Sequence, residues 1–140
     1  MRILSINSVP VYRQALLALC AAEWPDMKSI AVASPKISIP APLVALDSKN
    51  ELLGGLVFSQ FARPERADLA LWINAVVVRD DCRGQGIASR LIAQAEAAAR
   101  ATGASEQFVF TQFPGLYQKL GWQVVTESAQ DTVLSFSISP

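Results

Sequence analysis

The chain has 140 residues, no histidine and two cysteines, and its twelve basic and twelve acidic side chains cancel. A chain of this length can bury one core, so we expect a single domain over residues 1–140. The scattered basic residues argue against a nucleic-acid partner, and the missing histidine and unpaired cysteines argue against a metal site or a disulfide framework.

The N-terminal part is predicted to form a strand, a helix and a loop. Arg2 to Ile6 alternates as a strand does, and Ser34 to Pro42 holds three prolines typical of an irregular loop. Val11 to Trp24 has helical spacing until Pro25. The residues of this helix predicted to face inward are Val11, Leu16, Leu17, Cys20, Ala21 and Trp24.

Two hairpins are predicted next. Leu43 to Asp47 and Leu52 to Phe61 are apolar stretches joined by Ser48 to Glu51, which has the composition of a turn. After the turn Arg63 to Arg66, the unbroken apolar runs within Leu69 to Val78 predict a central strand buried on both faces.

A glycine-bearing loop leads from that strand into the longest predicted helix, which runs to Thr102 before the stop residue Gly103. Gly84 and Gly86 lack a Cβ, so successive N–H groups can converge on an anion at the positive helix end, beside Arg83. The same order also joins strands to helices for steric reasons alone. The predicted apolar face of the helix comprises Ile87, Ala88, Leu91, Ile92, Ala95, Ala98 and Ala99.

The C-terminal part is predicted to contain a strand at Gln107 to Thr111, a short helix at Leu116 to Leu120, and a final strand pair at Trp122 to Thr126 and Thr132 to Ile138. Antiparallel hairpins followed by strand, helix, strand and a closing pair predict an α+β fold, with helices on the faces of one sheet.

Two motifs carry a resemblance to a known family. The loop satisfies Arg/Gln-x-x-Gly-x-Gly/Ala through Arg83, Gly86 and Ala88, but has neither the Gly-Lys-Ser/Thr of a P-loop nor the third glycine of a dinucleotide fold. The segment from Tyr117 to Trp122 is similar to Tyr-x-x-Leu-Gly-Phe/Tyr/Trp. In this order, over roughly residues 71 to 125, the motifs resemble the GCN5-related N-acetyltransferases, the GNAT family.

The resemblance implies a fold, a co-substrate and a site. The fold is a mixed, mostly antiparallel sheet of six to seven strands with a V-shaped splay between its central strands. The co-substrate is acetyl-CoA, with the main-chain N–H of Val76 facing the thioester carbonyl and that of Val78 facing the pantetheine. Tyr117 is the general acid for the leaving thiolate. The diphosphate is held by the main chain of Arg83, Gly84, Gln85, Gly86, Ile87, Ala88 and Ser89.

The general base and the acceptor stay open. Many relatives carry a glutamate near the place of Asn74, and asparagine does not accept a proton usefully. Ordered water leading to Glu23, Asp68 or a backbone carbonyl, or an amine that arrives neutral, are the alternatives. Cys82 beside the loop invites a covalent role, but the chain has no histidine to activate it.

Two classes of function compete with each other. In the first, the protein transfers acetyl groups to a primary amine, on a small molecule or a peptide N-terminus. In the second, it is a non-catalytic acyl-CoA sensor or interaction module of the same fold. A nucleotide-binding domain of another fold, which would bind ATP or NAD, is a third interpretation.

The apolar pattern bears on location and assembly. No apolar run reaches the roughly 18 to 20 residues of a membrane span, and Met1 to Ile6 does not have the pattern of an export signal. We therefore expect a cytoplasmic protein without a membrane partner. The chain is 51% hydrophobic, and a homodimer interface would use part of that surface, although alanine-rich helices raise the same figure.

Overall fold

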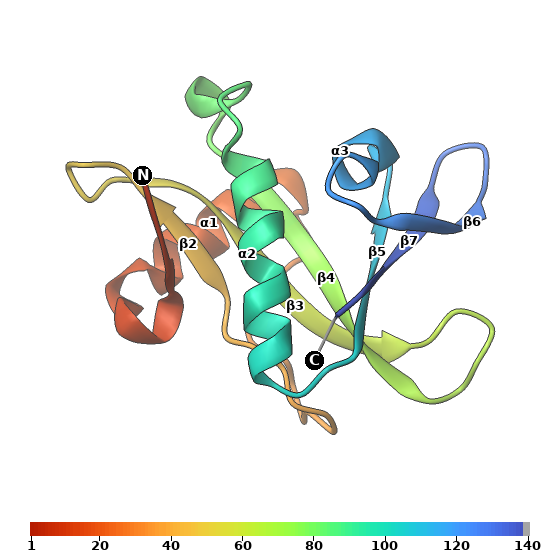
Figure 1. Ribbon diagram of the computed structural model, residues 1–140. Coiled ribbons are helices and arrows are strands. Elements are labelled where there is room, and N and C mark those ends of the chain that lie inside the picture. Colours follow the sequence, from red (N-terminus) through yellow and green to blue (C-terminus); the bar gives the residue numbers. More distant parts are fainter. Residues whose placement is uncertain (139–140) are drawn as a thin grey trace.

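Seven strands form one mixed sheet in the order β1-β2-β3-β4-β5-β7-β6 in the computed structural model, which describes residues 1–138 (Figure 1). Only β4 and β5 run parallel, and the other neighbours are antiparallel. The predicted fold class is confirmed. The strands are β1 (Arg2–Ser5), β2 (Leu43–Leu46), β3 (Leu52–Ala62), β4 (Leu69–Val78), β5 (Glu106–Thr111), β6 (Gln123–Glu127) and β7 (Thr132–Ser137).

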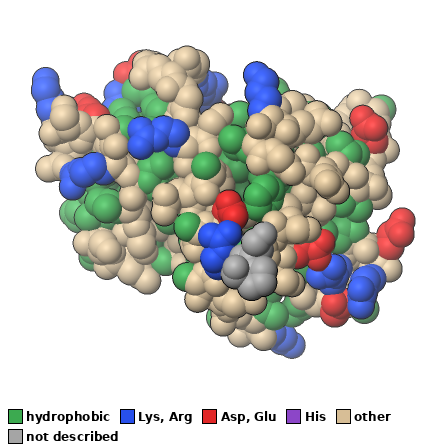
Figure 2. All heavy atoms as spheres, viewed as in Figure 1, with side chains coloured by type: hydrophobic (Ala, Val, Ile, Leu, Met, Phe, Trp, Pro, Cys, Tyr) green, Lys and Arg blue, Asp and Glu red, His purple; other side chains and the backbone are tan. Residues whose placement is uncertain are grey.

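Two helices cover opposite faces of the sheet, and a third lies beside its far end (Figure 1). These are α1 (Arg13–Glu23), α2 (Ile87–Ala101) and α3 (Pro114–Gln118), with single 3-10 turns at Ile6–Ser8, Pro10–Tyr12 and Asp80–Cys82. Within residues 1–138, none of the helices combines the length and apolar character needed to cross a membrane. Lys and Arg side chains are dispersed over the face seen in Figure 2 and do not merge into one patch.

The first helix is shorter than predicted, and the prediction of its inward face is wrong at both ends. Leu16 and Cys20 are fully buried, but Val11 is 82% exposed and Trp24 is 41% exposed. Val11 lies in the 3-10 turn before the helix, where the tighter winding moves its side chain off the α-helical stripe. Trp24 is the C-cap residue, and its φ of −129° and ψ of 86° are no longer helical, so its side chain leaves the helical stripe.

The second helix confirms its predicted buried face. Ile87, Leu91, Ile92, Ala95 and Ala99 are all buried and belong to the larger of the hydrophobic clusters, between α2 and the sheet. Alanine on this face lets a helix lie close to a sheet, because there is little side chain to hold the two backbones apart. This packing fixes the N-terminal end of α2 beside the end of β4, from which the helix is connected by a short loop (Figure 1).

The central strands β4 and β5 separate early. Their parallel pairing covers only Leu71–Ile73 against Gln107–Val109, whereas β4 stays paired with β3 as far as Val78. A β-bulge marks the point of separation, because Val57 pairs with Ala75 and the next residue of β3 pairs with Ile73, which leaves Asn74 unpaired. Beyond this point, among the described residues, one side of β4 has no strand partner.

The close pairing of β3 with β4 generates a stability prediction. A Cβ added at Gly54 would fall on the carbonyl oxygen of Val77, a backbone atom that cannot move aside without distorting the pairing. We expect Gly54→Ala to lower the free energy of unfolding by about 1 to 3 kcal/mol, as overpacking does. Urea denaturation followed by circular dichroism measures this.

The matched control is Gly115→Ala in α3, where an added Cβ meets nothing within 4 Å. Because alanine favours a helix over glycine, this change should be neutral or stabilise the protein by up to about 1 kcal/mol. If Gly54→Ala proved as harmless as Gly115→Ala, the tight β3–β4 approach would be wrong.

Candidate active site

A cavity of about 890 Å³ opens where β4 and β5 separate. It is at the upper end of the size range of ligand pockets, which is roughly 300 to 1,000 Å³. Every residue predicted to bind the co-substrate, and the predicted general acid, lines it except Gln85, which is exposed in the loop. Its lining comprises Glu23, Trp24, Ile73–Val78, Cys82–Gly84, Gly86–Ser89, Val109–Phe113, Leu116, Tyr117 and Asp131.

The main chain of β4 presents free N–H groups to this cavity. In an antiparallel pair, successive N–H groups point alternately toward the partner and away from it. The Arg79 N–H donates to the Leu53 carbonyl of β3 at 2.8 Å. Two residues earlier, the N–H of Val77 therefore also points toward β3. Val76 and Val78 therefore point their N–H groups into the gap, as their predicted roles require. Their side chains pack under α2 as ordinary core residues.

The glycine loop forms an open cradle at the start of α2. Gly84 and Gly86 have φ of +78° and +81°, and a Cβ on either would meet nothing within 4 Å. Gly86 is the N-cap, no side chain caps the helix, and the first N–H bonded back to the helix is that of Arg90, to Gly86. The preceding N–H groups, on Ile87, Ala88 and Ser89, are thus without helical partners at the positive end of the dipole. An anion fits this arrangement.

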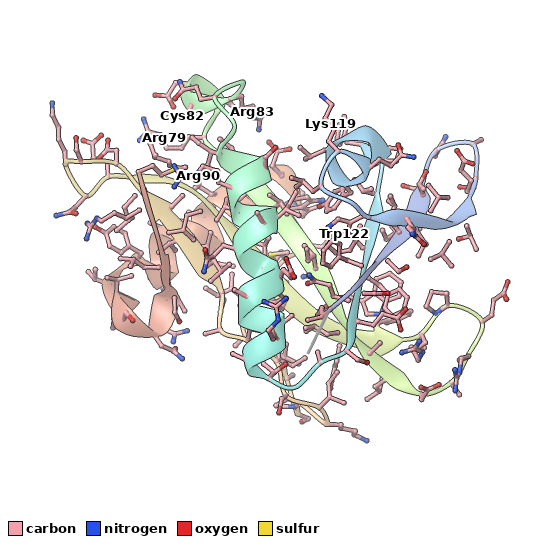
Figure 3. The ribbon with its side chains drawn as sticks, in the orientation of Figure 1. Arg79, Cys82, Arg83, Arg90, Lys119 and Trp122 are labelled. Carbon is pink, nitrogen blue, oxygen red and sulfur yellow. The ribbon has the colours of Figure 1, made fainter. Side chains whose placement is uncertain are left out.

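The Arg83 side chain connects the cradle to Glu23 at the end of α1. Figure 3 shows Arg83 in the loop that leads into α2. Its guanidinium lies 2.7 Å from a Glu23 carboxylate oxygen and 2.9 Å from an Asp80 oxygen, and its Nε donates to the Val78 carbonyl at 3.2 Å. The Glu23 hydrogen bond, followed by the charge of Asp80, raises the pKa of Arg83. The predicted free positive charge is therefore already shared with two carboxylates.

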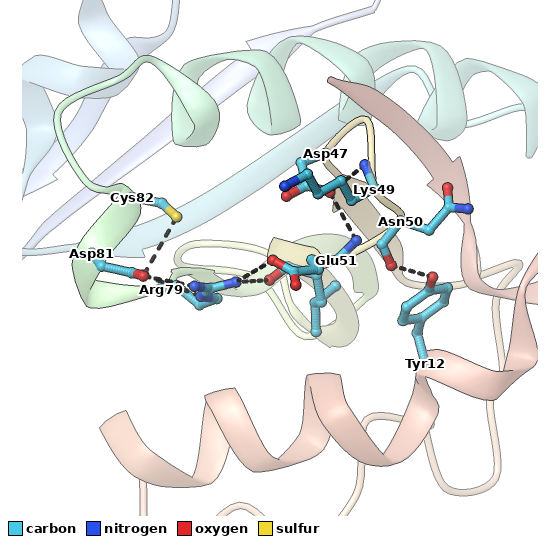
Figure 4. Close-up of polar contacts among 9 residues, drawn as sticks. Tyr12, Asp47, Lys49, Asn50, Glu51, Arg79, Asp81 and Cys82 are labelled. Atoms are coloured by element: carbon cyan, nitrogen blue, oxygen red, sulfur yellow. Dashed lines mark hydrogen bonds and ion pairs between the residues drawn. The ribbon is translucent and has the colours of Figure 1, made fainter.

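Cys82 takes part in a polar chain behind the cradle (Figure 4). Its thiol donates to Asp81 at 3.4 Å, and Asp81 in turn accepts from Arg79 at 2.6 Å. Burial, and then the hydrogen bond to Asp81, raise the pKa of the Cys82 thiol. A thiol with a raised pKa stays protonated at neutral pH, so the structure does not support a nucleophilic cysteine here.

Tyr117 lies on α3 and reaches the cavity from the side of β5. It is only 4% exposed, and burial raises its pKa, which keeps the phenol protonated at neutral pH. Among the described residues its hydroxyl has no hydrogen-bond partner, so it is free to donate to a ligand. The Tyr117 and Trp122 rings pack edge to face, with their centroids 5.3 Å apart. Trp122 is labelled in Figure 3.

The Tyr-x-x-Leu-Gly-Trp segment has a structural reason for its spacing. The Tyr117 carbonyl accepts from the N–H groups of both Leu120 and Trp122, at 3.0 and 3.1 Å. Gly121 has φ of +94°, a conformation that lets the chain reverse and return the indole of Trp122 onto the tyrosine. The segment therefore both ends α3 and fixes the phenol.

The candidates for the general base differ in whether they line the cavity. Asn74 is exposed in the bulge and lines the cavity, and Glu23 lines it while paired with Arg83. Asp68 pairs with Arg66 at 3.2 Å in the β3–β4 turn, outside the cavity lining. Asp131, which sequence reasoning missed, does line the cavity, because the pairing of β7 with β5 carries the β6–β7 turn to it.

A metal ion has no built site in the described part of the chain. No three His, Cys, Asp or Glu side chains within residues 1–138 are placed to hold one together.

The sequence matches a family model and a curated protein. Residues 41–124 match a family model described as the Acetyltransferase (GNAT) domain. Blasticidin-S acetyltransferase of Streptomyces morookaense is 38% identical over 84 residues, which are 57% of this chain and 57% of that protein. The chain thus spans little more than half the length of this curated relative.

Solved structures share the fold at low sequence identity. An aminoglycoside 6'-N-acetyltransferase complexed with coenzyme A superposes with a TM-score of 0.73 at 18% identity, covering 100% of this chain and 98% of that chain. The aminoglycoside 6'-N-acetyltransferase of Enterococcus faecium gives the same TM-score, identity and coverage.

The raised pKa of Cys82 predicts low reactivity. At pH 7.5 its alkylation by iodoacetamide should be at least about fivefold slower than that of glutathione, because less of the thiol is ionised. The rate should keep rising with pH above the ordinary thiol pKa. Mass spectrometry of the Cys82 peptide measures it, with buried Cys20, whose pKa is raised to about 11, as the internal reference. Faster alkylation than glutathione would instead indicate a stabilised thiolate.

Proposed function

The chain belongs to the GNAT acetyltransferase family, and from this we propose that it transfers the acetyl group of acetyl-CoA to a primary amine, by direct transfer in a ternary complex. The acceptor amine is carried by a small molecule or a peptide N-terminus. The observation that carries the proposal is the open cradle of N–H groups at α2, which leads directly into the cavity between β4 and β5.

The described residues fit the co-substrate along its length. The N–H groups from Gly84 to Ser89, which belong to a helix end and its loop, suit a diphosphate. The N–H of Val78 lies next along the cavity, where it suits the amide-bearing pantetheine arm. The cavity walls between the glycine loop and Val78 are mostly apolar, which suits the uncharged pantetheine arm.

The main chain supplies the polarising group in the proposed reaction. The N–H of Val76 is a donor for the thioester carbonyl, whose oxygen gains negative charge as the amine attacks. A donor of this kind contributes about 2.7 to 4 kcal/mol by analogy with oxyanion holes. Holding the two reactants in line contributes roughly 7 to 11 kcal/mol in well-oriented cases, so neither a metal nor a covalent enzyme intermediate is needed.

Tyr117 is the proposed general acid. The attacking amine is neutral, so as the C–N bond forms and the C–S bond breaks, the nitrogen loses one proton and the sulfur gains one, and this step needs no net base. An amine that arrives as an ammonium first releases its extra proton to solvent. A buried phenol with a raised pKa is a weaker acid than a thiol, and it gives up its proton to sulfur only as the proton released by nitrogen replaces it. This balance explains how a site with Asn74 in place of a carboxylate can still function.

The relatives support an amine acceptor in general terms. Two are named as aminoglycoside acetyltransferases and one as a blasticidin-S acetyltransferase. We further propose that residues 1–140 act as one domain in the cytoplasm, where both cysteines, which are free and buried, would stay reduced.

The test of the proposed function is binding followed by turnover. Calorimetry should detect acetyl-CoA, and at 100 times the dissociation constant the ligand should stabilise the protein by about 2.7 kcal/mol in thermal unfolding. ATP and NAD should not compete. Release of free thiol with a panel of amines separates the enzyme from a non-catalytic sensor, which would bind acetyl-CoA without turnover. Absence of acetyl-CoA binding would contradict both.

The Tyr117 hydroxyl has a separate prediction. Tyr117→Phe should lower kcat at least tenfold and leave the dissociation constant of acetyl-CoA within about twofold, because the ring still packs on Trp122. The matched control is Tyr12→Phe, the only other tyrosine, whose hydroxyl donates to the Asn50 carbonyl away from the cavity (Figure 4). Equal turnover in the two variants would remove Tyr117 from the mechanism.

A further inference from the structure

We infer that the acceptor is an amine with a single positive charge on a flat apolar body, bound by Trp24 and Phe110 on the face of the sheet opposite α2. The inference rests on the proposed acetyl transfer and specifies its substrate class. It depends on which face each side chain occupies, how exposed the aromatic residues are, and how few charges line the cavity.

The cavity has two ends on opposite faces of the sheet. Side chains alternate along β5, and Val109 packs in the cluster under α2, so Phe108 and Phe110 point to the other face. That other face is covered by α1, and Trp24 directly follows α1. The cradle belongs to the α2 end of the cavity. The Arg83 side chain extends from the cradle to Glu23, the residue before Trp24. The two aromatic side chains therefore lie on the face of the sheet away from α2, whereas the cradle lies at the start of α2.

Trp24 and Phe110 are far more exposed than two other aromatic side chains on the same face. Phe110 is 62% exposed and Trp24 41%, whereas Trp72 and Phe108, on the same face, are 9% and 2% exposed. The latter two form their own buried cluster, in which the Trp72 and Phe108 rings lie 5.2 Å apart. Covering the exposed part of an aromatic ring removes apolar surface from water, so these two rings favour a ligand with a flat apolar part.

The charges at the cavity favour one ammonium group. Its charged lining residues are Glu23, Arg83 and Asp131. Glu23 is paired with Arg83, whereas Asp131 has no ion pair among residues 1–138. Arg83 also pairs with Asp80, which lies outside the lining, so the three charged lining residues sum to one negative charge. That charge balances one ammonium. A polycation would bring several more charges into a cleft whose other polar side chains, such as Asn74 and Gln112, are neutral.

The experiment compares kcat/KM for three amines with the full chain and saturating acetyl-CoA. These are 2-phenylethylamine, n-butylamine, which has the same charge but no ring, and kanamycin, which is polycationic. We expect 2-phenylethylamine to exceed each of the others at least tenfold. Trp24→Ala and Phe110→Ala should each raise KM for 2-phenylethylamine at least fivefold, with kcat and the dissociation constant of CoA within about twofold. Trp24→Phe should restore most of the loss.

The matched control is Phe61→Ala. Phe61 is 66% exposed, close to the value for Phe110, but it lies outside the cavity lining. KM should not change in this variant. A preference for kanamycin or n-butylamine, or an unchanged KM in both Trp24→Ala and Phe110→Ala, would overturn the inference while leaving the acetyltransferase activity established.

A failure of the proposed acetyl transfer can be distinguished from a failure of this inference. If no amine released thiol, calorimetry of 2-phenylethylamine against the protein with bound CoA would still measure the aromatic end directly. Binding that weakens at least fivefold in Trp24→Ala would support the aromatic site without turnover. No binding to the unaltered protein would overturn the inference as well.

Discussion

The site depends on one constraint, the separation of β4 from β5 after only three paired residues. An unpaired N–H that is also cut off from water costs about 1 to 3 kcal/mol, so strands rarely part inside a sheet. Here each strand keeps one complete partner, because β4 pairs with β3 to Val78 and β5 pairs with β7 from Glu106 to Thr111. The open edge of β4 therefore faces a cavity, where water or a ligand can satisfy its N–H groups.

The elements around the gap hold it open from both sides. The buried face of α2 packs on the sheet and sets the cradle at the end of β4. On the other side, Tyr117 and Trp122 pack against each other, and Trp122 meets Phe136 of β7 at 5.5 Å. The Tyr-x-x-Leu-Gly-Trp segment is thus part of the packing that supports β5, and its tyrosine reaches the cavity because that packing fixes it.

Much of this could be predicted from the sequence, because local patterns determine it. The apolar runs of Leu69 to Val78 gave both ends of β4, and the helical spacing after Gly86 gave the buried face of α2. Contacts distant in sequence could not be read in this way. Asp131 reaches the cavity only through the pairing of β7, and the pKa of Cys82 is raised by burial and by Asp81, although the loop beside it is basic. Periodicity also failed at Trp24, because the helix stops one residue earlier.

The division of the cavity between two faces explains how proteins of the same fold can differ in substrate specificity. The groups proposed for the co-substrate are main-chain N–H groups of β4 and α2, and a main-chain donor constrains its side chain only where a Cβ would interfere, as over the cradle glycines. Structures of low sequence identity can therefore share this half of the site. Trp24, Phe110 and Asp131 act through their side chains, so substitution there changes the acceptor without disturbing the acetyl donor. The fold is consequently shared across such structures, whereas the acceptor must be inferred from these side chains.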